Sequence, residues 1–214
     1  FGFQRVGDLI WQAADSRARG FLMGATAGRT TLMGEGLQHQ DGHSLALAST
    51  VPACQAFDPA FAYEMAAIVK HGIRRMYGGD PAAGDPDIFY YLTVYNENYV
   101  MPAMRDEPGI EEAIVRGLYR WAEAPAASGP QATILFSGSA QGAVRQAAAD
   151  LVEHYDIGVE LWSATSYKSL REQGMEVERW NRLHPGQAPR TPLVTHLLAD
   201  APGPIVAVTD FIRA

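Results

Sequence analysis

Cysteine is almost absent from this 214-residue chain, in which Cys54 is the only one. A lone thiol cannot form a disulfide within the chain, so the composition favours a reducing compartment, and we expect a cytoplasmic protein. Cys54 has no activating neighbour in the sequence. We therefore expect it to be a small buried side chain without a chemical role.

Long apolar runs are missing as well. No stretch approaches the roughly 20 apolar residues that span a bilayer, so we expect no membrane contact. Asp8 interrupts the first apolar stretch, which does not fit a signal peptide. Because the first residue is Phe1 and not methionine, tag removal, processing and excision from a longer chain all remain open.

The chain also lacks a sustained run of lysine or arginine. Its 17 basic and 24 acidic residues give a formal net charge of -7. Nucleic-acid binding needs a positive surface, so this composition argues against nucleic acid as a partner. Hydrophobic residues make up 47%, which is ordinary for a globular protein with a buried core. The length suits one large domain or two modest ones.

The apolar spacing predicts strands that alternate with helices in both halves of the chain. Predicted strands cover residues 21–25, 51–57, 88–95, 132–136, 159–162 and 205–208. Predicted helices lie within 6–14, 58–76, 110–122, 142–155, 166–171 and 191–198. This order is typical of parallel βαβ units, so we predict an α/β fold with parallel sheets.

Two boundaries carry specific predictions. Asp58-Pro59 resembles a helix start, with aspartate as the cap and proline at the first helical position. Ala124–Pro130 is rich in alanine, proline, glycine and serine, and the strand pattern restarts at Ala132. We therefore expect Ala124–Pro130 to be an exposed connector between two separate βα units.

The densest polar cluster is the segment Gly34–Ser44. Its three glycines let the backbone approach a ligand closely, and Glu35, His39, Asp41 and His43 are groups that move protons near neutral pH. Two alternatives stay open. The segment is a plain polar surface loop, or His39, Asp41 and His43 bind a divalent ion, although their spacing matches no standard zinc signature.

The segment Ser137–Gly142 lies between a predicted strand and a predicted helix. It lacks the spacing of a dinucleotide-binding or phosphate-binding loop, and neither of its serines has the flanking glycines of a hydrolase nucleophile. We predict a tight turn there. The isolated histidines are expected at the surface or in packing roles: His71, His154, His184 and His196.

Several blocks, taken in order along the whole chain, resemble the homodimeric type of pyruvate dehydrogenase decarboxylating component, a thiamine-diphosphate-dependent family of the transketolase-like superfamily. The blocks are Phe1-Gly-Phe-Gln-Arg5, Gly28-Arg-Thr-Thr-Leu32, Gly34-Glu-Gly-Leu-Gln-His39, Asp41-Gly-His-Ser44, Asn96-Glu-Asn-Tyr99, Pro102-Ala-Met104, Glu178-Arg-Trp-Asn181 and Leu183-His-Pro185. No single block would suffice, but their order and spacing are specific.

The resemblance implies a division of the chain. Residues 1–105 are expected to be the later part of a pyrimidine-binding domain, 106–130 a connecting helix and linker, and 131–214 the beginning of a transketolase-type C-terminal domain. It also implies that the chain is an internal fragment. The ligands of the diphosphate and of Mg²⁺, and the glutamate that activates the cofactor, are expected outside it, so the fragment alone is expected to be inactive.

The resemblance further implies oxidative decarboxylation of pyruvate and transfer of the acetyl group to the lipoyl arm of an acetyltransferase component, by a homodimer. Phe1 matches the aromatic that packs on the aminopyrimidine ring, His39 the active-site histidine and Glu35 its acidic neighbour. Met33 and Gln40 depart from the family pattern, which leaves the exact substrate open. The alternatives are a related 2-oxo-acid dehydrogenase, a transketolase, or a non-catalytic binding or assembly module.

Overall fold

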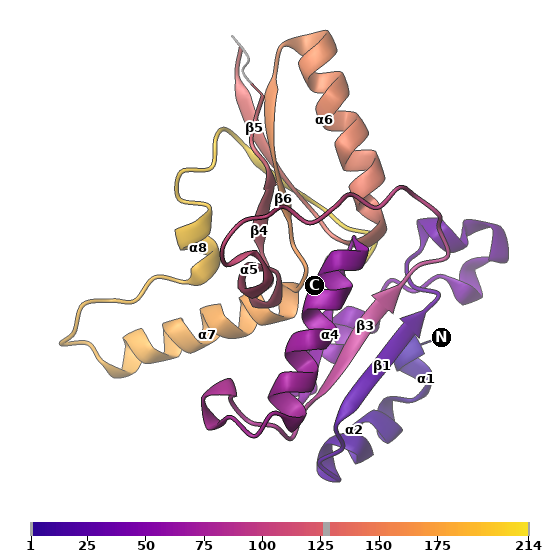
Figure 1. Ribbon diagram of the computed structural model, residues 1–214, viewed down its shortest axis with the longest axis vertical. Helices are drawn as coiled ribbons and strands as arrows, with labels where there is room; N and C mark the ends of the chain where they lie inside the picture. Colours follow the sequence, from indigo (N-terminus) through magenta and orange to yellow (C-terminus); the bar gives the residue numbers. More distant parts are fainter. Residues whose placement is uncertain (1, 126–128, 214) are drawn as a thin grey trace.

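The computed structural model describes residues 2–125 and 129–213, which form two α/β units in contact with each other (Figure 1). The first unit contains a three-stranded sheet and the second a four-stranded sheet. The predicted α/β class with parallel sheets is confirmed in both halves. Within the described ranges, no helix combines the length and the apolar character needed to cross a bilayer.

The first sheet has the strand order β1-β3-β2, and both neighbouring pairs are parallel. Its strands are β1 (Gly20–Ala25), β2 (Cys54–Phe57) and β3 (Phe89–Val94). Its helices are α1 (Gly2–Arg5), α2 (Gly7–Asp15), α3 (Ser44–Ala48) and α4 (Ala62–Tyr77). Because the strands are parallel, their carboxyl ends meet at one edge of the sheet, where ligands usually bind.

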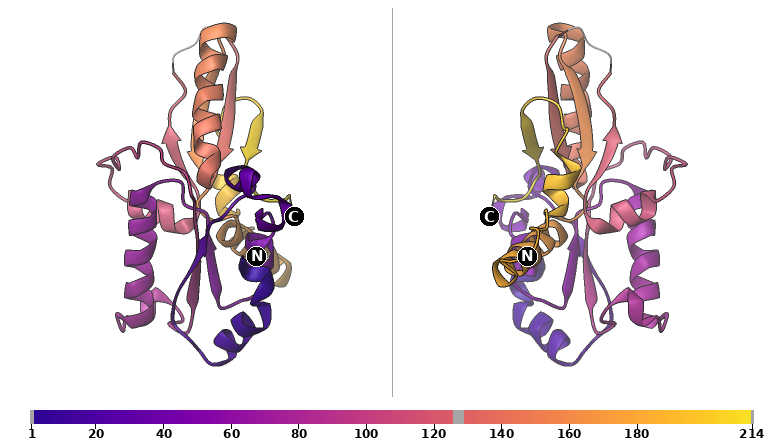
Figure 2. Two further views of the ribbon diagram at one scale, coloured as in Figure 1. Left: turned by 90° about the vertical axis from the view of Figure 1, so that its right-hand side faces the viewer. Right: turned by 90° about the vertical axis from the view of Figure 1, so that its left-hand side faces the viewer.

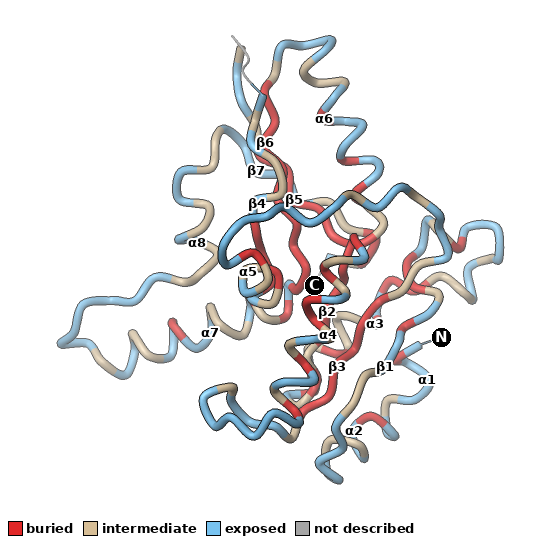
Figure 3. Tube along the Cα trace, in the orientation of Figure 1, coloured by how far each residue is buried: buried red, intermediate tan, exposed pale blue. Residues whose placement is uncertain are grey.

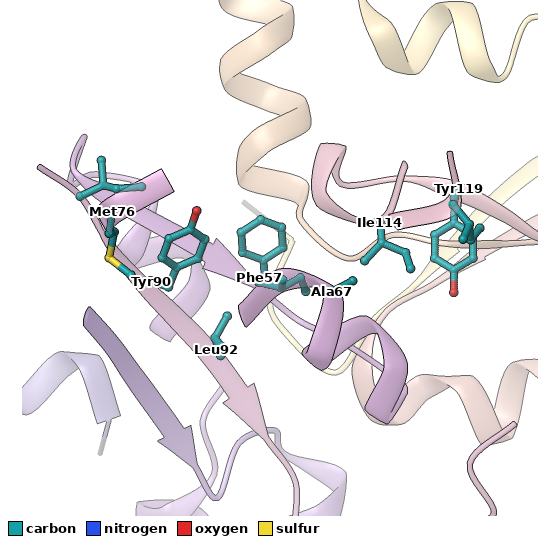
Figure 4. Packing of buried hydrophobic residues seen from close by; sticks show 10 residues of the cluster. Phe57, Ala67, Met76, Tyr90, Leu92, Ile114 and Tyr119 are labelled. Carbon is teal, nitrogen blue, oxygen red and sulfur yellow. The ribbon is translucent and has the colours of Figure 1, made fainter. Parts of the chain in front are cut away.

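The central strand β3 is buried on both faces, as its apolar sequence predicts. Tyr90 and Leu92 point toward α4 and pack with Phe57 (Figure 4). Phe89 and Tyr91 belong to a second cluster, which packs the opposite face against α1, α2 and α3. This alternation is the period of two that a strand imposes on its side chains. Cys54 is fully buried in the second cluster, as predicted.

The second sheet has the order β4-β6-β5-β7, with strands β4 (Tyr119–Ala122), β5 (Gln131–Phe136), β6 (Gly158–Ser163) and β7 (Ile205–Val208). Helix α6 (Gln141–Tyr155) covers one face, and α7 (Tyr167–Leu183) with α8 (Leu193–Leu197) lies on the other (Figures 1 and 2). Burial is concentrated along β5 and β6, while the distal end of α7 is exposed (Figure 3).

The helix predicted over residues 110–122 is shorter than expected. Helix α5 (Ile110–Arg116) ends at Gly117, whose φ of 105° lies in the left-handed region that favours glycine. The strand β4 follows and pairs antiparallel with β6. The second sheet therefore begins before Ala124–Pro130, so the described part of that segment connects β4 to β5 and not one unit to the next. Residues 126–128 lie outside the described residues.

The predicted helix start at Asp58-Pro59 is also wrong. Helix α4 begins at Ala62, with Phe61 as its N-terminal flanking residue. Glu64, in the first turn of α4, caps this end of the helix. Its Oε2 accepts hydrogen bonds from Ala60 N at 2.6 Å and from Phe61 N at 3.2 Å. A cap from within the helix replaces the one expected from the preceding residue.

Asp58 instead joins the two units. It is 2% exposed, and its carboxylate accepts hydrogen bonds from Thr93 Oγ1 at 2.6 Å, from the hydroxyl of Tyr95, and from Ser137 Oγ at 2.6 Å. The first two donors come from the end of β3 and the third from the end of β5. Gly138, with a φ of +49°, leaves room for this contact, because a β-carbon there would collide with Tyr95 and Asp58.

Candidate functional site

A polar cavity of about 150 Å³ opens at the carboxyl end of β1. Its walls come from the N-terminal helix, from the end of β1, from β3 and from the glycine-rich loop that covers residues 28–44. The lining residues are Gly2, Gly24, Ala25, Thr26, Leu32, Glu35, His39, Asp41 and Tyr91. The place and the polar walls make this cavity the candidate site.

The glycine-rich loop is built from two short 3₁₀ turns, η1 (Thr30–Glu35) and η2 (Leu37–His39). They are separated by Gly36, whose φ of +90° favours glycine. At the base of the loop, the Asp41 N–H donates to the Gly28 carbonyl at 2.8 Å, which forms an isolated bridge between the two ends. The two turns thus present Glu35 and His39 near the cavity from a closed loop.

Glu35 and His39 line the same cavity, so the structure brings together the two residues that the sequence singled out. Glu35 is exposed and His39 is half-buried. Phe1, the third predicted residue, lies outside the described residues. The two departures from the family pattern stand beside the cavity and not in its wall: Met33 is 74% exposed and Gln40 is half-buried.

Asp41 is buried and stabilises the C-terminal end of the glycine-rich loop. Its Oδ1 accepts from the backbone N–H groups of His43 at 3.1 Å and Ser44 at 3.0 Å, at the start of α3. The side chain of His43 is exposed and does not line the cavity. Among residues 2–125 and 129–213, no three histidine, cysteine or acidic side chains are arranged to hold a metal ion. The alternative of a metal site at His39, Asp41 and His43 is therefore unsupported.

Tyr91 is a cavity residue that sequence analysis missed. Its side chain is 4% exposed, and no described residue meets its hydroxyl in full hydrogen-bonding geometry. Burial raises the pKa of Tyr91 to about 12, against the opposing effect of the nearby Ser44 hydroxyl. At neutral pH the hydroxyl is therefore protonated and can donate a hydrogen bond into the cavity. The alternation along β3 was the signal that could have identified it, since every second residue faces this side.

Two other polar segments lie outside the cavity wall. Ser137–Gly142 forms a turn followed by α6, as predicted, and its first serine binds Asp58. Asn96–Tyr99 follows β3 as expected, yet none of its residues lines the cavity. Tyr99 donates its hydroxyl to the Ala60 carbonyl at 2.5 Å, which fixes the chain after β3 to the start of α4.

The chain matches two family models. Residues 1–102 match the pyruvate dehydrogenase E1 component middle domain, and residues 117–214 match the transketolase-like C-terminal domain. Over its whole length the chain is 50% identical to the pyruvate dehydrogenase E1 component of Pseudomonas aeruginosa and 47% identical to that of Escherichia coli. The chain belongs to the pyruvate dehydrogenase E1 family. It spans 23% of the length of each of these relatives.

Solved structures support the fold of this E1 segment. A transketolase from Pichia stipitis aligns with a TM-score of 0.60 over 98% of this chain and 28% of its own, at 16% identity. A transketolase from Leishmania mexicana aligns with a TM-score of 0.57 over 94% of this chain and 24% of its own, also at 16% identity. At this identity the likeness shows a shared fold alone.

Proposed function

We propose that the protein carrying this chain decarboxylates pyruvate oxidatively and transfers the acetyl group to the lipoyl arm of an acetyltransferase component. The observation that carries the proposal is the cavity that both Glu35 and His39 line, at the carboxyl end of a parallel sheet. The identity of 50% and 47% to pyruvate dehydrogenase E1 components favours pyruvate. Transketolases share the fold at 16% identity, which gives their substrates no support.

Thiamine diphosphate is the cofactor that this family implies, and the cavity fits part of it. The walls offer carboxylates, an imidazole and a buried phenol, which suit the nitrogen-rich ring and the reacting carbon. They do not suit the diphosphate, because Glu35 and Asp41 are acidic. When bound, the cofactor supplies an electron sink for decarboxylation. We therefore place the diphosphate and its Mg²⁺ on residues outside this chain.

The division of the chain follows from the same proposal. Residues 1–105 supply the later part of the pyrimidine-binding domain, and the second sheet begins a transketolase-type C-terminal domain. The boundary within 106–130 is best placed before β4, because β4 pairs in the second sheet. A homodimer in the cytoplasm, with the lipoyl-bearing component as its partner, completes the proposal.

His39 is the proton-handling group in this mechanism. Its imidazole lines the cavity and could donate to the keto oxygen of the substrate, which gains negative charge when the keto carbon is attacked, before carbon dioxide leaves. Glu35 lines the same cavity and can orient the imidazole. The Tyr91 hydroxyl offers a second, neutral donor from the opposite element, β3.

The His39→Ala variant of the full-length protein tests the proposal. We expect acetyl transfer from pyruvate to a lipoyl acceptor to fall by about 10²- to 10⁴-fold, the usual contribution of one proton-handling group. Cofactor affinity should change little, because the diphosphate is held elsewhere. The measurements are steady-state rates and a calorimetric titration with thiamine diphosphate and Mg²⁺.

His43→Ala is the matched control, since His43 lies in the same loop but is exposed and outside the cavity wall. It should keep near-normal activity. If His39 merely stabilises the loop, His39→Ala should lower thermal stability, rate and cofactor binding together. Near-wild-type turnover of His39→Ala would end the assignment, and equal losses from both variants would point back to a shared structural or metal role.

A further inference from the structure

The chain segment that follows β7 contacts the glycine-rich loop at its base. This segment, residues 209–212, belongs to the second unit, while the loop belongs to the first. None of its residues lines the cavity. The loop carries Glu35 and His39, so any contact that fixes its base also bears on where those two side chains lie.

Asp210 makes the central contact. It is 8% exposed, and its Oδ2 accepts from the backbone N–H of Arg29 at 2.5 Å and of Thr30 at 2.9 Å. These amides stand at the start of η1, the turn that ends at Glu35. A carboxylate that accepts from two backbone amides is a strong, charge-assisted contact. Asp210 thus caps the first turn of the loop from a distant part of the chain.

The side chain of Arg29 also binds the segment 209–212. Its Nε donates to the Asp210 carbonyl at 2.8 Å, and its Nη2 donates to the Phe211 carbonyl at 3.3 Å. On the other side of the loop, the Ile212 N–H donates to the Gly42 carbonyl at 2.9 Å. Both ends of the loop are therefore tied to one short segment, in addition to their own bridge.

Glycine at position 28 makes this approach possible. Its φ is +89°, and a β-carbon on it would lie 2.5 Å from Asp210 Oδ2. The segment is in turn anchored in the second unit, where Ser137 Oγ lies 3.0 Å from Thr209 Oγ1 and also binds Asp58. The position of the loop thus depends on how the second sheet sits against the first.

We propose that Asp210 and Arg29 are positioning residues that hold Glu35 and His39 at the cavity, so that the second unit sets the site without touching the substrate. This rests on the proposed function of the cavity. Loss of the Asp210 carboxylate frees the η1 amides and lets the loop move. Small displacements of a reacting group are costly, since a misplacement of about 1 Å can lower a rate by about 10²-fold.

The test compares Asp210→Ala, Asp210→Asn and Asp200→Ala in the full-length protein. Asp200 is the control, because it is exposed and lies ten residues earlier in the same unit. Asp210→Ala should lower kcat by about 10- to 100-fold with little change in KM or cofactor affinity. Asp210→Asn should recover part of the rate, because its amide oxygen still accepts from the η1 amides. Asp200→Ala should match the wild type.

Two further readouts separate positioning from general stability. If Asp210 acts through the loop, the double variant Asp210→Ala, His39→Ala should be no slower than His39→Ala alone. Independently of activity, amide hydrogen exchange in residues 30–40 should speed up in Asp210→Ala and stay unchanged in β3. Additive rate losses, unchanged exchange in the loop, or faster exchange throughout the molecule would overturn the proposal. A wild-type protein without pyruvate activity would overturn the proposed function and leave the exchange test intact.

Discussion

At the scale of single residues, Asp58 is a carboxylic acid buried among hydroxyl groups where the two sheets meet. Burial raises the pKa of Asp58 above its usual range, and the hydroxyls of Ser137, Thr93 and Tyr95 oppose that shift only in part. The neighbouring Asp210 adds to the increase in pKa. The protonated form is therefore favoured in the folded state relative to the unfolded one.

The consequence is a specific dependence of stability on pH. An acid whose pKa is raised by folding contributes most below its unfolded pKa, about 3.9, and loses that contribution as pH rises through the folded value. Asp58→Asn cannot ionise and keeps similar hydrogen bonds. We expect the free energy of unfolding of the wild type to decline relative to Asp58→Asn as pH rises above about 4.

Urea unfolding of both proteins at several pH values between about 4 and 8 measures this difference. Glu64 is buried and its pKa is raised as well. Because Glu64 is present in both proteins, its effect cancels in the difference between their free energies of unfolding. A constant difference across the range, or one that grows in favour of the wild type, would contradict the prediction.

Local signals could predict some residues of the site but not their partners. Glu35 and His39 stand in a short segment whose glycines and proton-active groups mark it in the sequence. Asp58 was misread as a cap because the Asp-Pro pair is a good local helix start. Its actual partner Ser137 is 79 residues away, and the partner of Arg29, Asp210, is 181 residues away. Contacts at such separations follow from the packing of sheets, which no local pattern specifies.

At the scale of elements, the start of α7 fastens the second unit to the first. Lys168 has a side chain 4% exposed, and its ammonium donates to the carbonyls of Ala48 at 3.1 Å, Val51 at 2.7 Å and Cys54. These carbonyls end α3 and begin β2. A buried cation placed among carbonyl oxygens is held by hydrogen bonds that are stronger than neutral ones.

We expect Lys168→Met to lower the free energy of unfolding by about 1–3 kcal/mol, since it removes charged hydrogen bonds that methionine cannot replace. Lys70→Met is the control: Lys70 pairs with Glu111 at 2.7 Å on the surface, where a pair contributes at most about 1 kcal/mol. Urea unfolding of the two variants gives both values. Equal losses would show that the buried contacts of Lys168 add nothing.

The periodic pattern predicted most strands and helices, because their apolar side chains recur at the spacing of a strand or of a helix. The prediction failed where a strand follows a helix directly, with no polar segment between them. Residues 110–122 read as one helix, yet the chain turns at Gly117 and continues as β4. Gly117 was a visible signal for the helix end. The antiparallel pairing of β4 with β6 was not, because an edge strand of four residues has little pattern of its own.

At the scale of the whole molecule, polar contacts join the two units at several places. Asp58 connects the ends of β3 and β5, and Asp210 connects the segment after β7 to the glycine-rich loop. The candidate cavity belongs to the first unit, but its loop is held from the second. The two family models match residues 1–102 and 117–214 separately. The cavity lies in the first range, yet residues of the second range hold its loop in place.

The charge of the cavity and of the whole chain limits what the isolated chain can bind. Its cavity of about 150 Å³ is lined by two carboxylates, Glu35 and Asp41, and the net charge of the chain is -7. Both features oppose a diphosphate, whose binding depends on backbone amides, cations or metal ions. We expect the isolated 214-residue chain to bind thiamine diphosphate with Mg²⁺ weakly and to show no turnover of pyruvate.

Calorimetric titration of the isolated chain with cofactor and Mg²⁺ tests this prediction. A cooperative thermal unfolding transition must first show that the isolated chain is folded. The full-length protein is the matched control, and it should bind the cofactor under the same conditions. The ring contacts alone cannot supply the free energy of about 8 kcal/mol that micromolar affinity requires, because the charged half of the ligand stays unpaired. A submicromolar dissociation constant for the isolated chain would show that this segment holds the diphosphate itself, and our placement of those ligands outside it would be wrong.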